Sequence, residues 1–77
     1  MASNKTVKTT DFRKVIQHWG LSLKGTNGSH ERWSRPGMVR PVIIQATHKE
    51  IPSFIFKNNL KTLDKTEEEF FEALASL

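Results

Sequence analysis

The dipeptide Asn27-Gly28 limits the fold of this chain more than any other feature of its sequence. An asparagine followed by a glycine adopts the positive φ values of a two-residue hairpin turn more readily than most residue pairs. The segment before it, 21–25, alternates apolar and polar residues as a half-buried strand does. The segment after it, 29–35, is therefore expected to return as an antiparallel strand.

The two faces of the returning strand are expected to differ, because successive side chains of a strand point to opposite faces. The residues divide into two sets, with His30, Arg32 and Ser34 on one face and Glu31, Trp33 and Arg35 on the other. We expect Trp33 to face the core, together with Leu21 and Leu23 of the preceding strand. His30 and Arg32 would then lie side by side on the wetter face.

A helix is predicted before the hairpin. Apolar residues recur there at helical spacing, namely Phe12, Val15, Ile16 and Trp19. Thr9 or Thr10 is expected to cap the start of this helix, and Gly20 supplies the left-handed residue that ends it.

A third strand is predicted over residues 39–46, after a turn at 36–38. Because Pro41 has no amide hydrogen to donate, this strand either lies at the edge of the sheet or begins at Val42.

Two segments near the C-terminus have helical patterns. Pro52 is expected to begin a helix that runs to about Asn59 and buries Phe54, Ile55 and Leu60, with Phe56 outside the apolar stripe. The second helix, 66–77, begins with a capping box formed by Thr66 and Glu69. Its apolar stripe comprises Phe70, Leu74 and Leu77, with Phe71 beside it.

The predicted order is a helix, three antiparallel strands and one or two C-terminal helices (α-β-β-β-α, with the additional helix left open). This is an α+β fold in which helices pack against a sheet. A chain of 77 residues buries too little surface to divide its core, so residues 1–77 are expected to form one domain. Residues 1–8 are expected to be flexible.

The basic residues are concentrated in one half of the chain. The net charge is +4, with eight Lys or Arg and two acidic residues in 1–40, against four and six in 41–77. Such a bias favours a polyanionic partner such as RNA or DNA. A solvated surface that keeps the protein soluble has the same composition, so charge alone leaves both readings open.

Composition excludes several kinds of site and location. The chain has no cysteine, which excludes disulfides, thiolate nucleophiles and cysteine-bound zinc. No apolar run is long enough to span a membrane, and residues 1–10 lack the apolar region of a secretory signal. We therefore expect a cytoplasmic protein that does not enter membranes.

The histidines are the residues best suited to chemistry. His30, beside Arg32 and next to a tight turn, suits acid–base work on a phosphate ester, although a lone surface histidine without a role fits the same pattern. His48 is either a loop residue or a second acid/base, and His18 flanks the first helix. No two histidines have metal-ligand spacing, so we expect no metal site and no cofactor.

Other catalytic and nucleotide-binding motifs are missing from the chain. No serine sits in a G-x-S-x-G elbow, and the loop at residues 25–28 lacks the lysine and serine pattern of a P-loop.

Residues 5–50 resemble the HicA-type toxins, the small mRNA interferases of bacterial HicA/HicB toxin–antitoxin systems. The match rests on a helix ended by Gly20, a strand, and then the G-S-H signature of the family, which is present as Gly28, Ser29 and His30. The sequence departs from the family pattern after the third strand: Gln45 stands where the family often has proline, and no glycines follow His48. Gly25 and Asn27 also replace basic residues that are common in the family.

The resemblance implies a fold like a double-stranded-RNA-binding domain, metal-independent cleavage of RNA by His30, and neutralisation by a HicB-type antitoxin protein. In this interpretation His30 is a general base on a ribose 2′-hydroxyl, and Ser29 orients its ring or contacts phosphate. The RNA-binding cations would be Lys24, Arg32 and Arg35. We expect broad sequence tolerance, because no base-reading pocket is evident. Two alternatives remain open: a non-catalytic RNA-binding module, or a degenerate family member retained for protein contacts.

Overall fold

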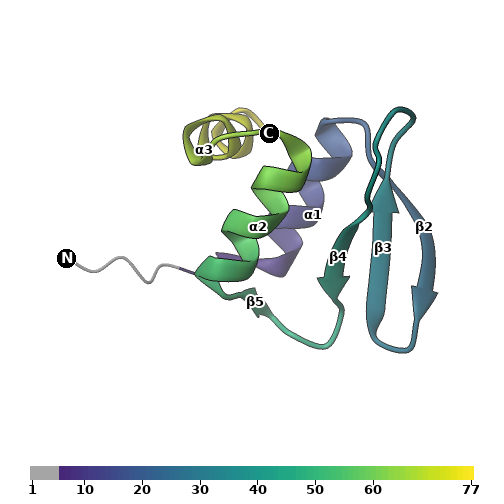
Figure 1. Cartoon of the computed structure of the whole chain (residues 1–77). Coiled ribbons are helices and arrows are strands. Elements are labelled where there is room, and N and C mark those ends of the chain that lie inside the picture. The colour runs from purple at the N-terminus through teal and green to yellow at the C-terminus, as the bar shows by residue number, and fades with distance from the viewer. Residues whose placement is uncertain (1–5) are drawn as a thin grey trace.

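An antiparallel hairpin forms where the sequence predicts one, but its two-residue turn is Gly28-Ser29 rather than Asn27-Gly28 (Figure 1). Asn27 is the last residue of the first strand and pairs with His30, so the predicted turn was wrong by one residue. The computed structural model describes residues 6–77. In it, β2 (Ser22–Asn27) pairs with β3 (His30–Ser34), and Gly28 has a φ of 64°. The positive φ explains the glycine, because a side chain at this position would strain the backbone.

The third strand, β4 (Val42–Gln45), begins at Val42, one of the two predicted arrangements. It pairs antiparallel with β3, so the order of the sheet is β2-β3-β4 and β3 is central. His30 lies opposite Asn27 on β2 and opposite Gln45 on β4. Together with three helices within residues 6–77, this antiparallel sheet confirms the α+β class.

The first helix, α1 (Thr9–His18), buries Phe12, Val15 and Ile16 completely, as predicted. Neither threonine caps it: Lys8 holds the N-cap position, and no side chain accepts from the first turn. The hydroxyl of Thr9 instead donates to the carbonyl oxygen of His48 over 2.7 Å. The predicted cap was wrong because the helix begins one residue earlier, where the Thr9 hydroxyl has a tertiary acceptor.

A small ribbon not predicted from the sequence precedes α1. Val7–Lys8 form β1, which pairs antiparallel with β5 (Glu50–Ile51). Of the segment 1–8, for which flexibility is predicted, Val7 and Lys8 belong to this ribbon, and residues 1–5 lie outside the described part of the chain. The buried side chains of Val7 and Ile51 hold the ribbon against the core.

The second helix, α2 (Ser53–Leu63), is longer than predicted and turns a different face to the core. Phe54 is 66% exposed and Ile55 is 36% exposed, whereas Phe56, Leu60 and Leu63 are buried. The predicted buried face was wrong because three consecutive apolar residues, 54–56, leave the phase of the helix undetermined. Leu63 fixes that phase, since it lies two turns beyond Phe56 on the same face.

The third helix, α3 (Glu67–Ser76), begins with the predicted capping box. The Glu69 amide donates to the Thr66 hydroxyl over 3.0 Å, and the Glu69 carboxylate accepts from the Thr66 amide over 2.8 Å. Phe70 is completely buried against Phe12 and Phe56, with ring centroids 5.7 and 4.9 Å away. Leu77 is exposed, so the apolar stripe is shorter than predicted.

The helices lie on one side of the sheet and leave its other face open (Figure 1). The core-facing side chains of the sheet are Trp33, Val42 and Ile44. Leu23, predicted to face inward, lies opposite the buried Trp33 but is 47% exposed. No helix within residues 6–77 is both long and apolar enough to cross a membrane.

Candidate functional site

The open face of the sheet carries the two side chains that the alternation of β3 places there. His30 and Arg32 are both exposed, as expected. The guanidinium of Arg32 extends over Gly25 of β2, so closely that a methyl group at Gly25 would come within 2.9 Å of Nη2. Arg32 therefore leans toward β2, whereas His30 stands beside β4.

The opposite face of β3 is tied to α1 by an ion pair. Arg13 donates from Nε to Oε1 of Glu31 over 3.1 Å and from Nη2 to Oε2 over 3.0 Å. The indole Nε1 of Trp33 also donates to Oε1, over 3.0 Å. These hydrogen bonds, those of Arg13 above all, lower the pKa of Glu31 despite its partial burial. The backbone next to His30 is thereby fixed to the helical layer.

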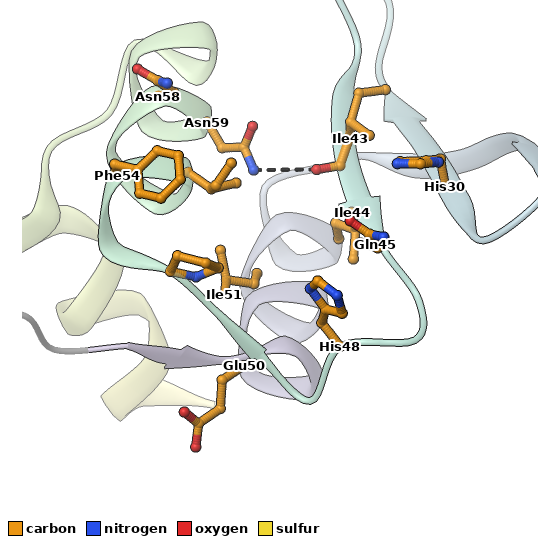
Figure 2. A pocket seen from close by; sticks show the side chains of 12 residues that line it. His30, Ile43, Ile44, Gln45, His48, Glu50, Ile51, Phe54, Asn58 and Asn59 are labelled. Atoms are coloured by element: carbon orange, nitrogen blue, oxygen red, sulfur yellow. Dashed lines mark hydrogen bonds between the residues drawn. The ribbon is translucent and has the colours of Figure 1, made fainter.

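A groove of about 470 Å³ runs between the outer edge of β4 and the start of α2 (Figure 2). It lies beside His30 and extends to the turn that follows β4. Its walls are mainly apolar, with Ile43 and Ile44 from β4 and Phe54 and Ile55 from α2. This size is in the range of pockets that hold small ligands.

Two histidines line this groove, His30 from β3 and His48 from the turn after β4. The backbone holds His48 from two sides: its amide donates to the Gln45 carbonyl over 3.2 Å, and its own carbonyl accepts from Thr9. In the view of Figure 2, the Gln45 side chain lies between the two imidazole rings. The structure thus places both histidines on one groove, whereas the sequence left His48 open between a loop residue and a second acid/base.

Ser29 and Gly28 support the His30 end of the groove. Ser29 is half-buried, and its carbonyl oxygen accepts from the Ala46 amide over 2.7 Å. This bond joins the hairpin turn to the turn that carries His48. Gly28 has open space around it, so its role is the backbone conformation of the turn.

The predicted RNA-binding cations are distributed unevenly around the site. Lys24 is exposed in the irregular part of β2, on the far edge of the sheet from the groove. Arg35 lies beyond the opposite end of β3, where Nη1 donates to the Trp19 carbonyl over 3.2 Å. Arg32 is the nearest of the three to His30 along the chain, and none of them lines the groove itself.

The α2 side of the groove was missed by sequence reasoning. Phe54 and Ile55 were assigned to the core, and Asn58 and Asn59 were given no role, yet all four line the groove. Asn59 Nδ2 donates to the Ile43 carbonyl over 3.4 Å, across the groove (Figure 2). The available signal was a pair of adjacent asparagines on a helix, because such residues are weak helix formers.

The carboxylate of Glu50 adds little negative charge to the groove. Glu50 belongs to the lining, but it accepts from the Thr6 hydroxyl over 2.7 Å and points away from the groove in Figure 2. Within residues 6–77 no three His, Asp or Glu side chains are grouped as metal ligands. The site therefore offers two exposed imidazoles, apolar walls and amides, a set suited to proton transfer next to a bound organic group.

Comparisons of this chain with protein-family models, with curated proteins and with solved structures found no match.

Proposed function

We propose that the protein is a metal-independent endoribonuclease of the HicA type, an mRNA interferase toxin. The observation that carries this proposal is the pair of exposed imidazoles, His30 and His48, that line one groove beside the open face of the sheet. Two histidines on either side of a phosphodiester can accept and donate the protons of an RNA transesterification. The Gly28-Ser29-His30 signature supports the same assignment.

The proposed reaction begins with the proton of a ribose 2′-hydroxyl, which His30 accepts. The 2′-oxygen attacks the adjacent phosphorus, and the bond from phosphorus to the 5′-oxygen of the next nucleotide breaks. The products are a 2′,3′-cyclic phosphate and a 5′-hydroxyl end. His48 donates the proton that the departing 5′-oxygen requires, so the proton count is balanced across the step.

Cations near His30 would stabilise the charge that develops on the phosphate. Arg32 is the side chain best placed, because it shares the open face with His30. Its guanidinium leans toward β2, so it is placed to bind a phosphate of an RNA strand that crosses the open face of the sheet. Lys24 and Arg35, which lie farther away, would add a sequence-independent attraction for the RNA backbone.

This proposal includes the remaining properties of the HicA type. The fold would be that of a double-stranded-RNA-binding domain, and the activity would be located in the cytoplasm, where mRNA is accessible. A HicB-type antitoxin protein would neutralise the toxin by covering the groove and His30.

The decisive experiment compares wild type with His30→Ala on a labelled mRNA in the presence of a metal chelator. We expect the variant to lose cleavage and growth arrest, by about 10²- to 10⁴-fold, with an unchanged circular-dichroism spectrum. A matched control is His18→Ala, which removes an exposed histidine from α1, outside the groove. Full cleavage by His30→Ala would refute the assignment.

The role of His48 has a separate signature. A reaction with one base and one acid has a bell-shaped dependence of kcat/KM on pH. We expect His48→Ala to remove the alkaline limb of that profile while the acid limb remains. An unchanged profile would show that His48 is not the proton donor and that another titrating group produces the alkaline limb.

The same assays distinguish the alternatives. A DNA strand of the same sequence should stay intact, since it has no 2′-hydroxyl. Binding of RNA without cleavage, together with loss of toxicity, would favour the non-catalytic RNA-binding module.

A further inference from the structure

We propose that the groove between β4 and α2 is a nucleobase subsite, which holds the base of a nucleotide next to the phosphate at His30. The inference rests on the proposed function, because it places the scissile phosphate at the histidine end of the groove. It goes beyond that function in one respect: it predicts that the RNA is selected by a base. The sequence alone suggested no such pocket.

The walls of the groove have the chemistry that a base face requires. Phe54 lines the groove and is 66% exposed, and Ile43 on the opposite wall is 38% exposed. Apolar side chains on the two walls of a groove of about 470 Å³ form a slot that a flat aromatic ring can enter. Base stacking on aromatic side chains is a main source of affinity for single-stranded RNA.

Two amides stand where the edge of an inserted base would lie. Asn58 is exposed on α2 and lines the groove. Asn59 uses one donor on the Ile43 carbonyl, which leaves its second N–H and its carbonyl oxygen for a ligand. Carboxamides pair with the donor and acceptor groups of base edges, so these residues supply the capacity to distinguish bases.

The same features argue against a peptide strand as the occupant. A strand added to the edge of β4 would require the outward-facing carbonyl of Ile43, and Asn59 already donates to that oxygen. His30 and His48 line the groove, and the Glu50 carboxylate points away from it. This charge distribution suits a ligand flanked by phosphates.

The test measures binding separately from cleavage. The His30→Ala protein is titrated with labelled eight-nucleotide strands of A, C, G or U, and with strands of the preferred sequence that contain abasic sites. Fluorescence anisotropy reports the Kd. We expect one homopolymer to bind more tightly than the others, and the abasic strand to bind about five- to hundredfold more weakly than its parent.

A matched pair of variants locates the subsite. Phe54→Ala in the His30→Ala background should weaken binding of the preferred strand by about the same factor as the abasic site does. The affinity for the abasic strand itself should not change with this substitution. Phe71→Ala removes a comparably exposed phenylalanine from α3, outside the groove, and should stay within twofold of the parent. Asn58→Ala should reduce the preference among the four homopolymers.

Several results would overturn the proposal. One is equal affinity for the abasic and the intact strands, and another is an equal effect of Phe54→Ala and Phe71→Ala on RNA binding. A third is a Phe54→Ala protein that no longer binds an antitoxin-like protein but still binds RNA. Failure of the subsite is distinguishable from failure of the proposed function. An enzyme that cleaves all four homopolymers at one rate lacks only the subsite, whereas one that discriminates bases in binding but never cleaves lacks only the catalysis.

Discussion

The two faces of β3 differ in almost every physical property, although their residues alternate along five positions of the chain. On the helical side, Trp33 is buried and Glu31 is held by Arg13. On the open side, His30 and Arg32 are exposed, and His30 borders a groove.

This difference shows how a small domain can hold an exposed histidine in a fixed position on the surface. The hydrogen bonds of Glu31 fix the backbone between His30 and Arg32, and the packing of Trp33 fixes the backbone that follows Arg32. The inward face therefore provides the stability, and the outward face is free for chemistry. Substitutions on the two faces should separate these roles.

The largest expected effect is on the inward face. Trp33→Ala removes a buried aromatic side chain and should lower the free energy of unfolding by about 3–5 kcal/mol. His30→Ala, three residues earlier on the same strand, should change it by less than about 0.5 kcal/mol. Urea denaturation followed by circular dichroism measures both. Equal losses would contradict the division between the faces.

Glu31→Gln should have an intermediate effect. The variant keeps an acceptor for Trp33 but removes the charge that Arg13 pairs with, and the two side chains of this pair are 14% and 27% exposed. We expect the free energy of unfolding to fall by about 1–2 kcal/mol, less than for a fully buried pair. The control is Glu67→Gln in the exposed first turn of α3. A Glu31→Gln protein as stable as wild type would show that the ion pair contributes nothing net.

The same pair predicts a pH dependence. Since Arg13 lowers the pKa of Glu31 below its ordinary value of 4.5, the unfolded chain takes up a proton at this carboxyl before the folded protein does. The excess stability of wild type over Glu31→Gln is therefore fully present above pH 4.5. It is lost as the pH falls through the pKa that Glu31 has in the folded protein. Denaturation of both proteins at several pH values tests this. An advantage that grows on acidification would contradict the sign.

The smallest effect on stability is expected on the outward face. Arg32→Gln should change the free energy of unfolding by less than about 0.5 kcal/mol. It should lower the slope of log Kd for single-stranded RNA against log salt concentration by about 0.7, the contribution of one phosphate contact. Lys61→Gln, an exposed charge removed from α2 outside the groove, is the matched control. A similar change in slope for both variants would show a diffuse effect of net charge.

Local signals predicted the parts of this fold that depend on neighbours in sequence. Each of these signals involves only a few neighbouring residues. They are the hairpin near Gly28, the apolar stripe of α1, the capping box of Thr66 and the alternation along β3. The short strands β1 and β5 were missed, because two residues are too few to show a period.

Only part of the candidate site could be predicted from the sequence, for the same reason. His30 stands out by its place after a turn, but the groove is made by segments that meet only in the folded chain, β4 and the start of α2. Phe54 appeared to be a core residue because its neighbours in sequence are also apolar. Only the packing of Phe56, Leu60 and Leu63 shows which side of α2 is left for the groove.

Analysis of the cleavage products tests the central claim most directly. A defined RNA is incubated with wild type and with His30→Ala in a metal chelator, and the ends are identified by mass spectrometry. The account predicts 2′,3′-cyclic phosphate and 5′-hydroxyl ends from wild type, none from the variant, and no cleavage where a single 2′-deoxynucleotide replaces the nucleotide at the cut. Cleavage at that deoxynucleotide, or 3′-hydroxyl ends from wild type, would contradict it.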